Sequence, residues 1–190
     1  MHDVRFLGNH LNVVEPPGID VVTPLGLEGL ERASSTPNQH PTIIEIESRP
    51  HITLYSSSFV EPTKLESIVK TFASKQEPLP LSLSAIGGLP NDNNFLFLAP
   101  TPSLSLLQFH SQLYDALKKE GIEISEEYRP DSWIPYCAVA QDVPKARIGE
   151  AFCVLRDLKL PVTGYAMDIG LVEFSPVREL FSFVLGNSVE

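Results

Sequence analysis

The stretch RPHITLYS occupies residues 49–56 and alternates polar with apolar side chains after its proline. This pattern predicts a β-strand, because successive side chains of a strand point to opposite faces. His51, Thr53 and Tyr55 would share one face, and the intervening isoleucine and leucine would share the other. An imidazole and a hydroxyl would thus project from one surface, about 7 Å apart along the chain.

The residues after this strand predict a helix and two more strands. Pro62 suits the first position of a helix, whose apolar residues recur at the spacing of a buried stripe: Leu65, Ile68, Val69 and Phe72. Alternating leucines over residues 79–84 and the apolar run 95–98 each predict a strand, and Gly87 with Gly88 predicts a turn between them. The result is a strand, helix, strand, strand unit.

A connecting helix then leads to a second unit. Thr101 and Pro102 supply a cap and a first turn, Gly121 can close the helix, and its stripe consists of Leu106, Phe109, Leu113 and Leu117. The second unit has a strand over residues 133–140, a helix from about Pro144 with Ile148, Ala151, Phe152 and Leu155 on one stripe, and strands over roughly 162–174 and 177–185.

The two units have the same order of elements and the same spacing. Phe95 lies 44 positions after His51, and Leu180 lies 44 positions after Tyr136. Both His51 and Tyr136 directly follow a proline that opens the first strand of their unit. The equal spacing predicts two duplicated lobes, in which positions 51 and 53 of one match positions 136 and 138 of the other.

The domain organisation follows from these elements. Prolines, glycines and short polar runs interrupt residues 1–42, which predicts an irregular or partly disordered leader. We expect one two-lobed domain over residues 43–190, with lobe one at about 43–100, a connector helix at about 102–121 and lobe two at about 130–187. An altered leader could also leave the first lobe unfinished, with an exposed sheet edge.

The composition indicates a globular protein. Hydrophobic residues make up 43% of the 190, enough for a substantial core, and no apolar stretch reaches the length of a membrane span. We expect a monomer in the cytoplasm, with the nucleus as the alternative, that binds no membrane. The formal charge of −10 argues against an extended nucleic-acid surface but allows a small phosphate ester or nucleotide in a local pocket.

The paired positions suggest a chemistry for facing strands. Where two lobes each supply a His-x-Thr triplet, one neutral imidazole can take a proton from the attacking oxygen while a protonated imidazole gives one to the leaving oxygen. The threonine hydroxyls can hydrogen-bond the nonbridging oxygens of a phosphate. This reaction needs neither a metal nor another cofactor.

Two segments resemble the motif strands of the two-histidine phosphoesterases, which include the LigT-like 2′-5′ RNA ligases and the plant RNA ligase/cyclic nucleotide phosphodiesterase proteins. They are RPHITL at residues 49–54 and WIPYCAVA at residues 133–140. The resemblance covers about residues 45–187. It implies an α+β fold of two lobes, with duplicated antiparallel sheets, outer helices and an active cleft between the lobes. It also implies hydrolysis or transfer at 2′,3′-cyclic phosphates of nucleotides, RNA ends or ADP-ribose derivatives.

The second motif departs from the family pattern Trp-x-Pro-His-x-Thr, because it has Tyr136 and Ala138 at the last two defining positions. A tyrosine, with a pKa of about 10, exchanges protons poorly near neutral pH compared with histidine at about 6.5. Losing one proton-transfer partner typically costs on the order of a hundred- to ten-thousand-fold in rate. His51 and Thr53 are therefore the retained catalytic candidates, and Tyr136 and Ala138 are ligand-contacting candidates. We expect impaired phosphodiesterase activity; the alternative is a non-catalytic member that binds a phosphorylated ligand or a protein.

Four further residues have simpler interpretations. Trp133 suits a buried aromatic at a strand start more than a platform for a nucleobase. His110 lies on the connector helix, where a structural or surface role is the expectation. Cys137 and Cys153 lack the paired spacing of metal ligands or of a disulfide framework, which predicts buried reduced thiols.

Overall fold

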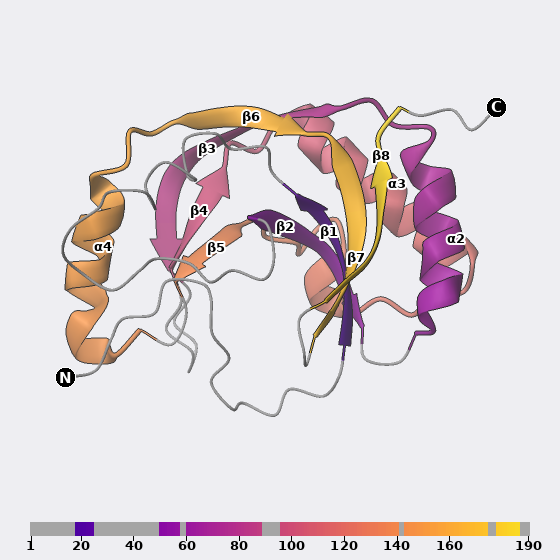
Figure 1. The fold of residues 1–190 in the computed structure, drawn as a ribbon, viewed down its shortest axis with the longest axis horizontal. Coiled ribbons are helices and arrows are strands. Elements are labelled where there is room, and N and C mark those ends of the chain that lie inside the picture. The colour runs from indigo at the N-terminus through magenta and orange to yellow at the C-terminus, as the bar shows by residue number, and fades with distance from the viewer. Residues whose placement is uncertain are drawn as a thin grey trace.

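The computed structural model describes residues 18–24, 50–57, 60–88, 96–140, 143–174 and 178–186, with the backbone alone for residues 18–24 and Phe174. Within these residues the chain forms two four-stranded antiparallel sheets and three α-helices (Figure 1). The first sheet has the order β2 (His51–Ser57), β1 (Gly18–Pro24), β7 (Asp168–Phe174), β8 (Arg178–Val184). The second has the order β5 (Cys137–Ala140), β4 (Leu96–Pro100), β3 (Leu79–Gly88), β6 (Val162–Ala166). The predicted α+β class, with duplicated antiparallel sheets and outer helices, is confirmed.

Each sheet takes strands from both units of the sequence. β3 and β4 of the first unit pair with β6 and β5 of the second, and β7 pairs with β1, so that β7 and β8 lie in one sheet with β1 and β2. The prediction that each lobe is a continuous stretch of sequence is therefore wrong for the strands. Spacing along the chain cannot show this exchange, because it carries no information on which edges pair.

The leader contributes a central strand to the first sheet. β1 lies between β2 and β7 and pairs antiparallel with both. The expectation of an irregular leader is thus wrong for residues 18–24, and the remainder of residues 1–42 lies outside the described part of the chain. Because β1 fills the position beside β2, the strand that begins at His51 has a partner along one side.

The stretch predicted as a single strand over residues 162–174 is two strands. β6 pairs with β3 in the second sheet, and β7 pairs with β1 and β8 in the first. The chain passes from one sheet to the other at Met167, whose carbonyl accepts a hydrogen bond of 2.9 Å from the Leu185 amide. Figure 1 shows β6 running over the top of the molecule into β7.

Two helices pack their apolar stripes into one large core. In α2 (Pro62–Ala73), Leu65, Val69 and Phe72 are buried as predicted. In α3 (Leu104–Lys119), the predicted stripe is buried along its whole length, and Phe109 meets Phe72 edge to face at 5.0 Å. This core also includes the buried residues of β2 and β3, and Ile169 and Leu171 of β7.

The ends of α3 show how the helix is bounded. Ser103 is the N-cap and accepts a hydrogen bond from the Leu106 amide, so the predicted cap at Thr101 is wrong. Thr101 instead donates its hydroxyl hydrogen bond to Ser84 of β3. At the other end, Gly121 adopts a φ of +71°, a left-handed conformation that glycine accepts at little cost, and so closes the helix as predicted.

A third helix covers the second sheet. α4 (Ile148–Arg156) follows a short 3₁₀ turn, Lys145–Arg147, and buries Ala151 and Leu155 in a smaller cluster with Leu96 and Ala140. Phe152 is 39% exposed, so it lies outside the stripe predicted for this helix. None of the helices in the described part of the chain has the length and apolar character that a membrane crossing requires.

We predict that a chain starting at residue 43 loses its cooperative thermal transition or unfolds far below the full chain. Removing the leader deletes β1 and leaves β2 and β7 without the strand that joins them. Circular dichroism melting of the two proteins tests this. Coincident, equally sharp transitions would show that the first sheet does not depend on β1.

Candidate active site

The strand that begins at His51 lies at one edge of the first sheet as the described strands define it. In β2, His51 and Thr53 are half-buried, whereas Ile52 between them is fully buried. The predicted alternation holds over these three residues. An imidazole and a hydroxyl therefore share the face of β2 that points away from the core. Arg49, the first residue of the motif, lies outside the described residues.

A β-bulge ends this alternation at Leu54. Adjacent residues of β1 pair with Thr53 and with Tyr55, which leaves Leu54 as an extra residue in the ladder. A bulge of this kind changes the side-chain direction of the residues after it. Tyr55 is 1% exposed and belongs to the core, so the prediction that it shares a face with Thr53 is wrong.

The second motif strand is shorter than predicted. β5 begins at Cys137, and residues 133–136 approach it without strand pairing. Pro135 has no amide hydrogen for a ladder, which favours an irregular approach. Tyr136 and Ala138 are half-buried and Cys137 is fully buried, which repeats the burial pattern of residues 51–53.

A matched bulge in β5 supports the internal repeat. Adjacent residues of β4 pair with Ala138 and Ala140, which leaves Val139 as the extra residue. Val139 lies as far after Tyr136 as Leu54 lies after His51. Since bulges are positioned features of a strand, their equal placement supports the matching of the two motifs.

An aromatic cluster occupies the second half of the candidate site. Phe97 of β4 pairs directly across from Ala138, and its ring lies 5.4 Å from the ring of Tyr136. The same ring covers Gly87 of β3, where an added Cβ would collide with the Phe97 Cζ. The interpretation of Gly87 as a turn residue is therefore wrong: it is a strand residue that leaves room for an aromatic ring.

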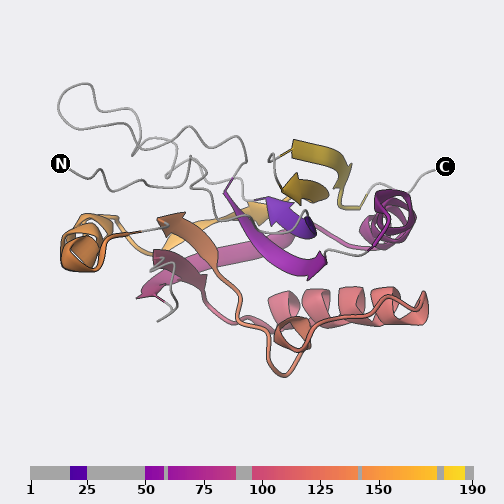
Figure 2. The same ribbon diagram turned by 90° about the horizontal axis from the view of Figure 1, so that it is seen from below.

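The two motif strands lie against each other near the centre of the molecule. β2 and β5 are in contact, as Figures 1 and 2 show, and the Cys137 thiol is hydrogen-bonded to the backbone of His51. Burial raises the pKa of this thiol to about 12, so it stays protonated and unreactive near neutral pH. The expectation of a buried reduced thiol is confirmed for Cys137 and wrong for Cys153, which is exposed on α4.

The chain between α3 and β5 runs along the outer edge of β2. Tyr55 donates its hydroxyl hydrogen bond to the carbonyl of Glu123 at 3.2 Å, and its ring meets Tyr128 edge to face at 6.3 Å. The Trp133 indole N–H donates to the carbonyl of Thr53 at 3.1 Å. Trp133 is 9% exposed, which confirms its interpretation as a buried aromatic.

His110 of α3 is a buried residue that contacts the same strand, β2. Its ring stacks on Trp133 with centroids 3.8 Å apart and planes 6° from parallel, and it is hydrogen-bonded to the backbone of Leu54. Burial lowers the pKa of His110 to about 4, against which the hydrogen bond acts weakly. The structural interpretation is confirmed. The position of His110, four residues after Leu106 on the buried stripe, was the sequence signal for it.

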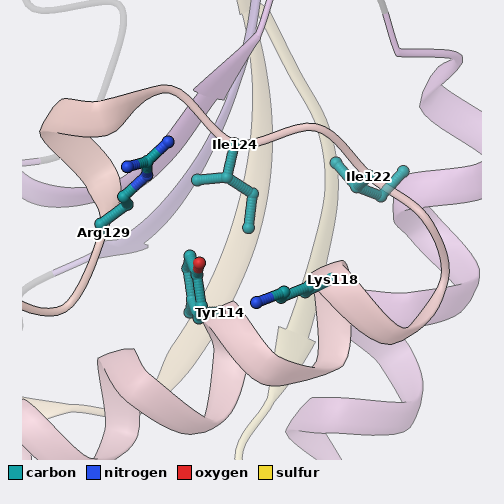
Figure 3. Close-up of a pocket in the computed structure, with 5 residues that line it drawn as sticks. All are labelled: Tyr114, Lys118, Ile122, Ile124 and Arg129. Carbon is teal, nitrogen blue, oxygen red and sulfur yellow. The ribbon is translucent and has the colours of Figure 1, made fainter.

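A separate hollow of about 360 Å³ lies between the C-terminal half of α3 and the segment after it (Figure 3). Its lining residues are Tyr114, Lys118, Ile122, Ile124 and Arg129. The Lys118 ammonium lies 5.7 Å from the ring centre of Tyr114. Across the described ranges, no three His, Cys, Asp or Glu side chains are grouped in a way that could hold a metal ion.

A family model for the 2′-5′ RNA ligase superfamily matches residues 47–176. This match spans both motif strands, α2, α3 and α4. The chain therefore belongs to the 2′-5′ RNA ligase superfamily, and the resemblance found in the two motifs is confirmed. A comparison with curated protein sequences found no match.

Solved structures support the same fold. E. coli LigT in complex with 3′-AMP is 19% identical, with a TM-score of 0.56, over 91% of this chain and 100% of LigT. LigT in complex with NADP+ is 15% identical, with a TM-score of 0.53, over 91% of this chain and 99% of LigT. A crystal structure described as a phosphoesterase is 17% identical, with a TM-score of 0.57, over 90% of this chain and 100% of its own.

We predict that stability falls as the pH is lowered from about 6.5 to 4, by an amount that depends on His110. The unfolded chain takes up a proton at the ordinary histidine pKa, whereas the folded chain resists until about pH 4. Above pH 6.5 both states are neutral and this penalty is absent. By pH 4.5 it amounts to roughly 2–3 kcal/mol.

Urea unfolding at pH 7 and pH 4.5 checks this, with His110→Gln as the comparison that removes the titrating group. The carboxylates contribute equally to both proteins, so the difference in unfolding free energy between them isolates His110. If the two proteins differ in unfolding free energy by the same amount at both pH values, the prediction is contradicted.

We also predict that Gly87→Ala destabilises the protein by about 1–3 kcal/mol, because the new methyl group displaces the Phe97 ring toward Tyr136. In a Phe97→Leu background, which lacks the Cζ atom, the destabilisation by Gly87→Ala should be less than half of that in the parent protein. A double-mutant cycle by chemical denaturation measures the coupling. Additive costs would mean that the ring does not constrain residue 87.

Proposed function

We propose that the protein is a cyclic-phosphodiesterase-like member of its superfamily that binds a 2′,3′-cyclic phosphate, or its product monoester, at His51 and Thr53. The observation that carries this proposal is the placement of these side chains on one face of β2, directly beside β5. The phosphate would belong to a nucleotide, an RNA end or an ADP-ribose derivative. LigT structures hold small nucleotides, 3′-AMP and NADP+ among them, which supports a ligand of this class.

The proposed roles follow from the chemistry of the side chains. His51 acts as the general base or acid, the role that histidine fills most often in proton transfer. The Thr53 hydroxyl donates a hydrogen bond to a nonbridging phosphate oxygen. Tyr136 can donate one hydrogen bond but is a poor proton carrier, and Ala138 offers none. Turnover should therefore be slower than in a protein with two intact His-x-Thr motifs, by a factor on the order of a hundred to ten thousand.

The alternative function is binding without catalysis. It is favoured by the packing of Tyr136 against Phe97, because an aromatic pair of this kind stabilises the second sheet in place of a proton-transfer group. A phosphorylated small molecule is the ligand that fits this alternative best, since the charge of −10 repels larger polyanions.

We predict that the combined change Tyr136→His and Ala138→Thr raises the hydrolysis rate of 2′,3′-cyclic AMP by about a hundred- to ten-thousand-fold. The change restores a second imidazole and a second hydroxyl at the positions that match His51 and Thr53. Chromatographic separation of substrate and monophosphate product measures the rate. Adding His51→Ala to this variant should remove the gain.

Tyr165→His provides a matched control, because it makes the same substitution at an exposed position of β6 in the same sheet. It should leave the rate unchanged. A folded Tyr136→His, Ala138→Thr variant with no gain over the parent would show that the two motif strands do not form one site. Undetectable turnover by the parent together with binding of 3′-AMP would favour the alternative.

A further inference from the structure

The placement of His51 and Thr53 depends on which backbone groups of β2 are held on the side away from β1. Three side chains from other elements reach this strand. The Trp133 indole N–H meets the Thr53 carbonyl, the His110 ring is hydrogen-bonded to the Leu54 backbone, and the Cys137 thiol is hydrogen-bonded to the His51 backbone. These contacts fall on His51, on Thr53 and on Leu54, which is the bulge residue.

The bulge makes the strand sensitive to its register. In a regular strand a slip of one residue exchanges the two faces, and the buried and outward side chains change places. The extra residue at Leu54 is what allows Thr53 to point outward while Tyr55 points into the core. Contacts that hold the backbone before the bulge and at the bulge would keep His51 and Thr53 on the outward face.

We propose that Trp133 and His110 are a pair of positioning residues that fix the bulge of β2 and so hold His51 and Thr53 on the ligand-binding face. Neither touches the ligand. Trp133 fixes the carbonyl before the bulge, His110 fixes the backbone at the bulge, and their parallel stack at 3.8 Å holds each ring in place through the other. Cys137 adds a third contact from the second motif strand.

A positioning role and a role in core packing can be separated, because the first depends on the hydrogen-bonding groups of Trp133 and His110 and the second on their rings. Trp133→Phe keeps a ring that can stack on His110 but removes the N–H that meets Thr53. His110→Phe keeps a ring that can stack on Trp133 but removes the hydrogen bond to Leu54. A packing role predicts small local effects for both changes, whereas a positioning role predicts that β2 loosens beside the bulge.

The test compares both variants with Phe109→Leu in the full chain. Phe109 neighbours His110 on α3 but packs on Phe72, so its truncation weakens the core without removing the contact that Trp133 or His110 makes to the β2 backbone. Amide hydrogen exchange by NMR is followed at residues 53–55 and, as the internal reference, at Ile169 and Leu171 of β7. Binding of 3′-AMP is measured by calorimetry.

We expect Trp133→Phe and His110→Phe to raise exchange at residues 53–55 about tenfold relative to β7, and to weaken 3′-AMP binding about five- to thirtyfold. Phe109→Leu should lower the melting temperature while leaving both the exchange ratio and the affinity unchanged. An unchanged ratio in both ring variants, or the same local increase in Phe109→Leu, would overturn the proposal.

The binding arm rests on the proposed function, and the exchange arm does not. If 3′-AMP fails to bind the parent protein, the proposed ligand is wrong, while the exchange ratio still decides whether the pair holds the bulge. If 3′-AMP binds the parent and both ring variants with equal affinity, the pair does not position the site, even though the proposed function stands.

Discussion

The outer edge of β2 is the constraint on which the candidate site depends. An edge strand presents backbone groups that need partners, and it can slip or pair wrongly when it lacks them. Here the chain that leaves α3 supplies one such partner shortly before it enters β5: the Trp133 indole N–H, which donates to the Thr53 carbonyl. The first residue of the second motif is therefore also a residue that holds the first motif in place. Residues between the motifs also contact this strand, because Glu123 and Tyr128 both meet Tyr55.

The two halves of the site are alike in backbone and different in chemistry. Both motif strands lie at sheet edges, both bury the residue between two half-buried positions, and both carry a bulge after them. On the first half these positions offer an imidazole and a hydroxyl. On the second they offer a phenol ring, packed on Phe97, and a methyl group. The two motifs thus share a backbone framework while the side chains at their matched positions differ in chemistry.

Much of the fold could be predicted from the sequence, because its strongest signals are local. The apolar stripes of α2 and α3, the closure at Gly121 and the strand at His51 all follow from spacing or from turn chemistry. The exchange of strands between sheets could not, since it depends on pairing between distant segments. The bulge at Leu54 and the ring over Gly87 were missed for the same reason: each is defined by the strand beside it. His51 and Thr53 could be predicted as a pair, while the residues that hold them could not.

The passage of the chain from β6 to β7 at Met167 affects the order in which the protein can fold during its synthesis. The first sheet joins β1, at residues 18–24, to β7 and β8, at residues 168–184, and Gly18 pairs with Phe174. During synthesis β1 and β2 cannot complete this sheet until the residues through β8 have left the ribosome. Such long-range pairing slows folding, because loops must close before their contacts form. The interlocked sheets thus favour assembly in one late step over the successive folding of two halves.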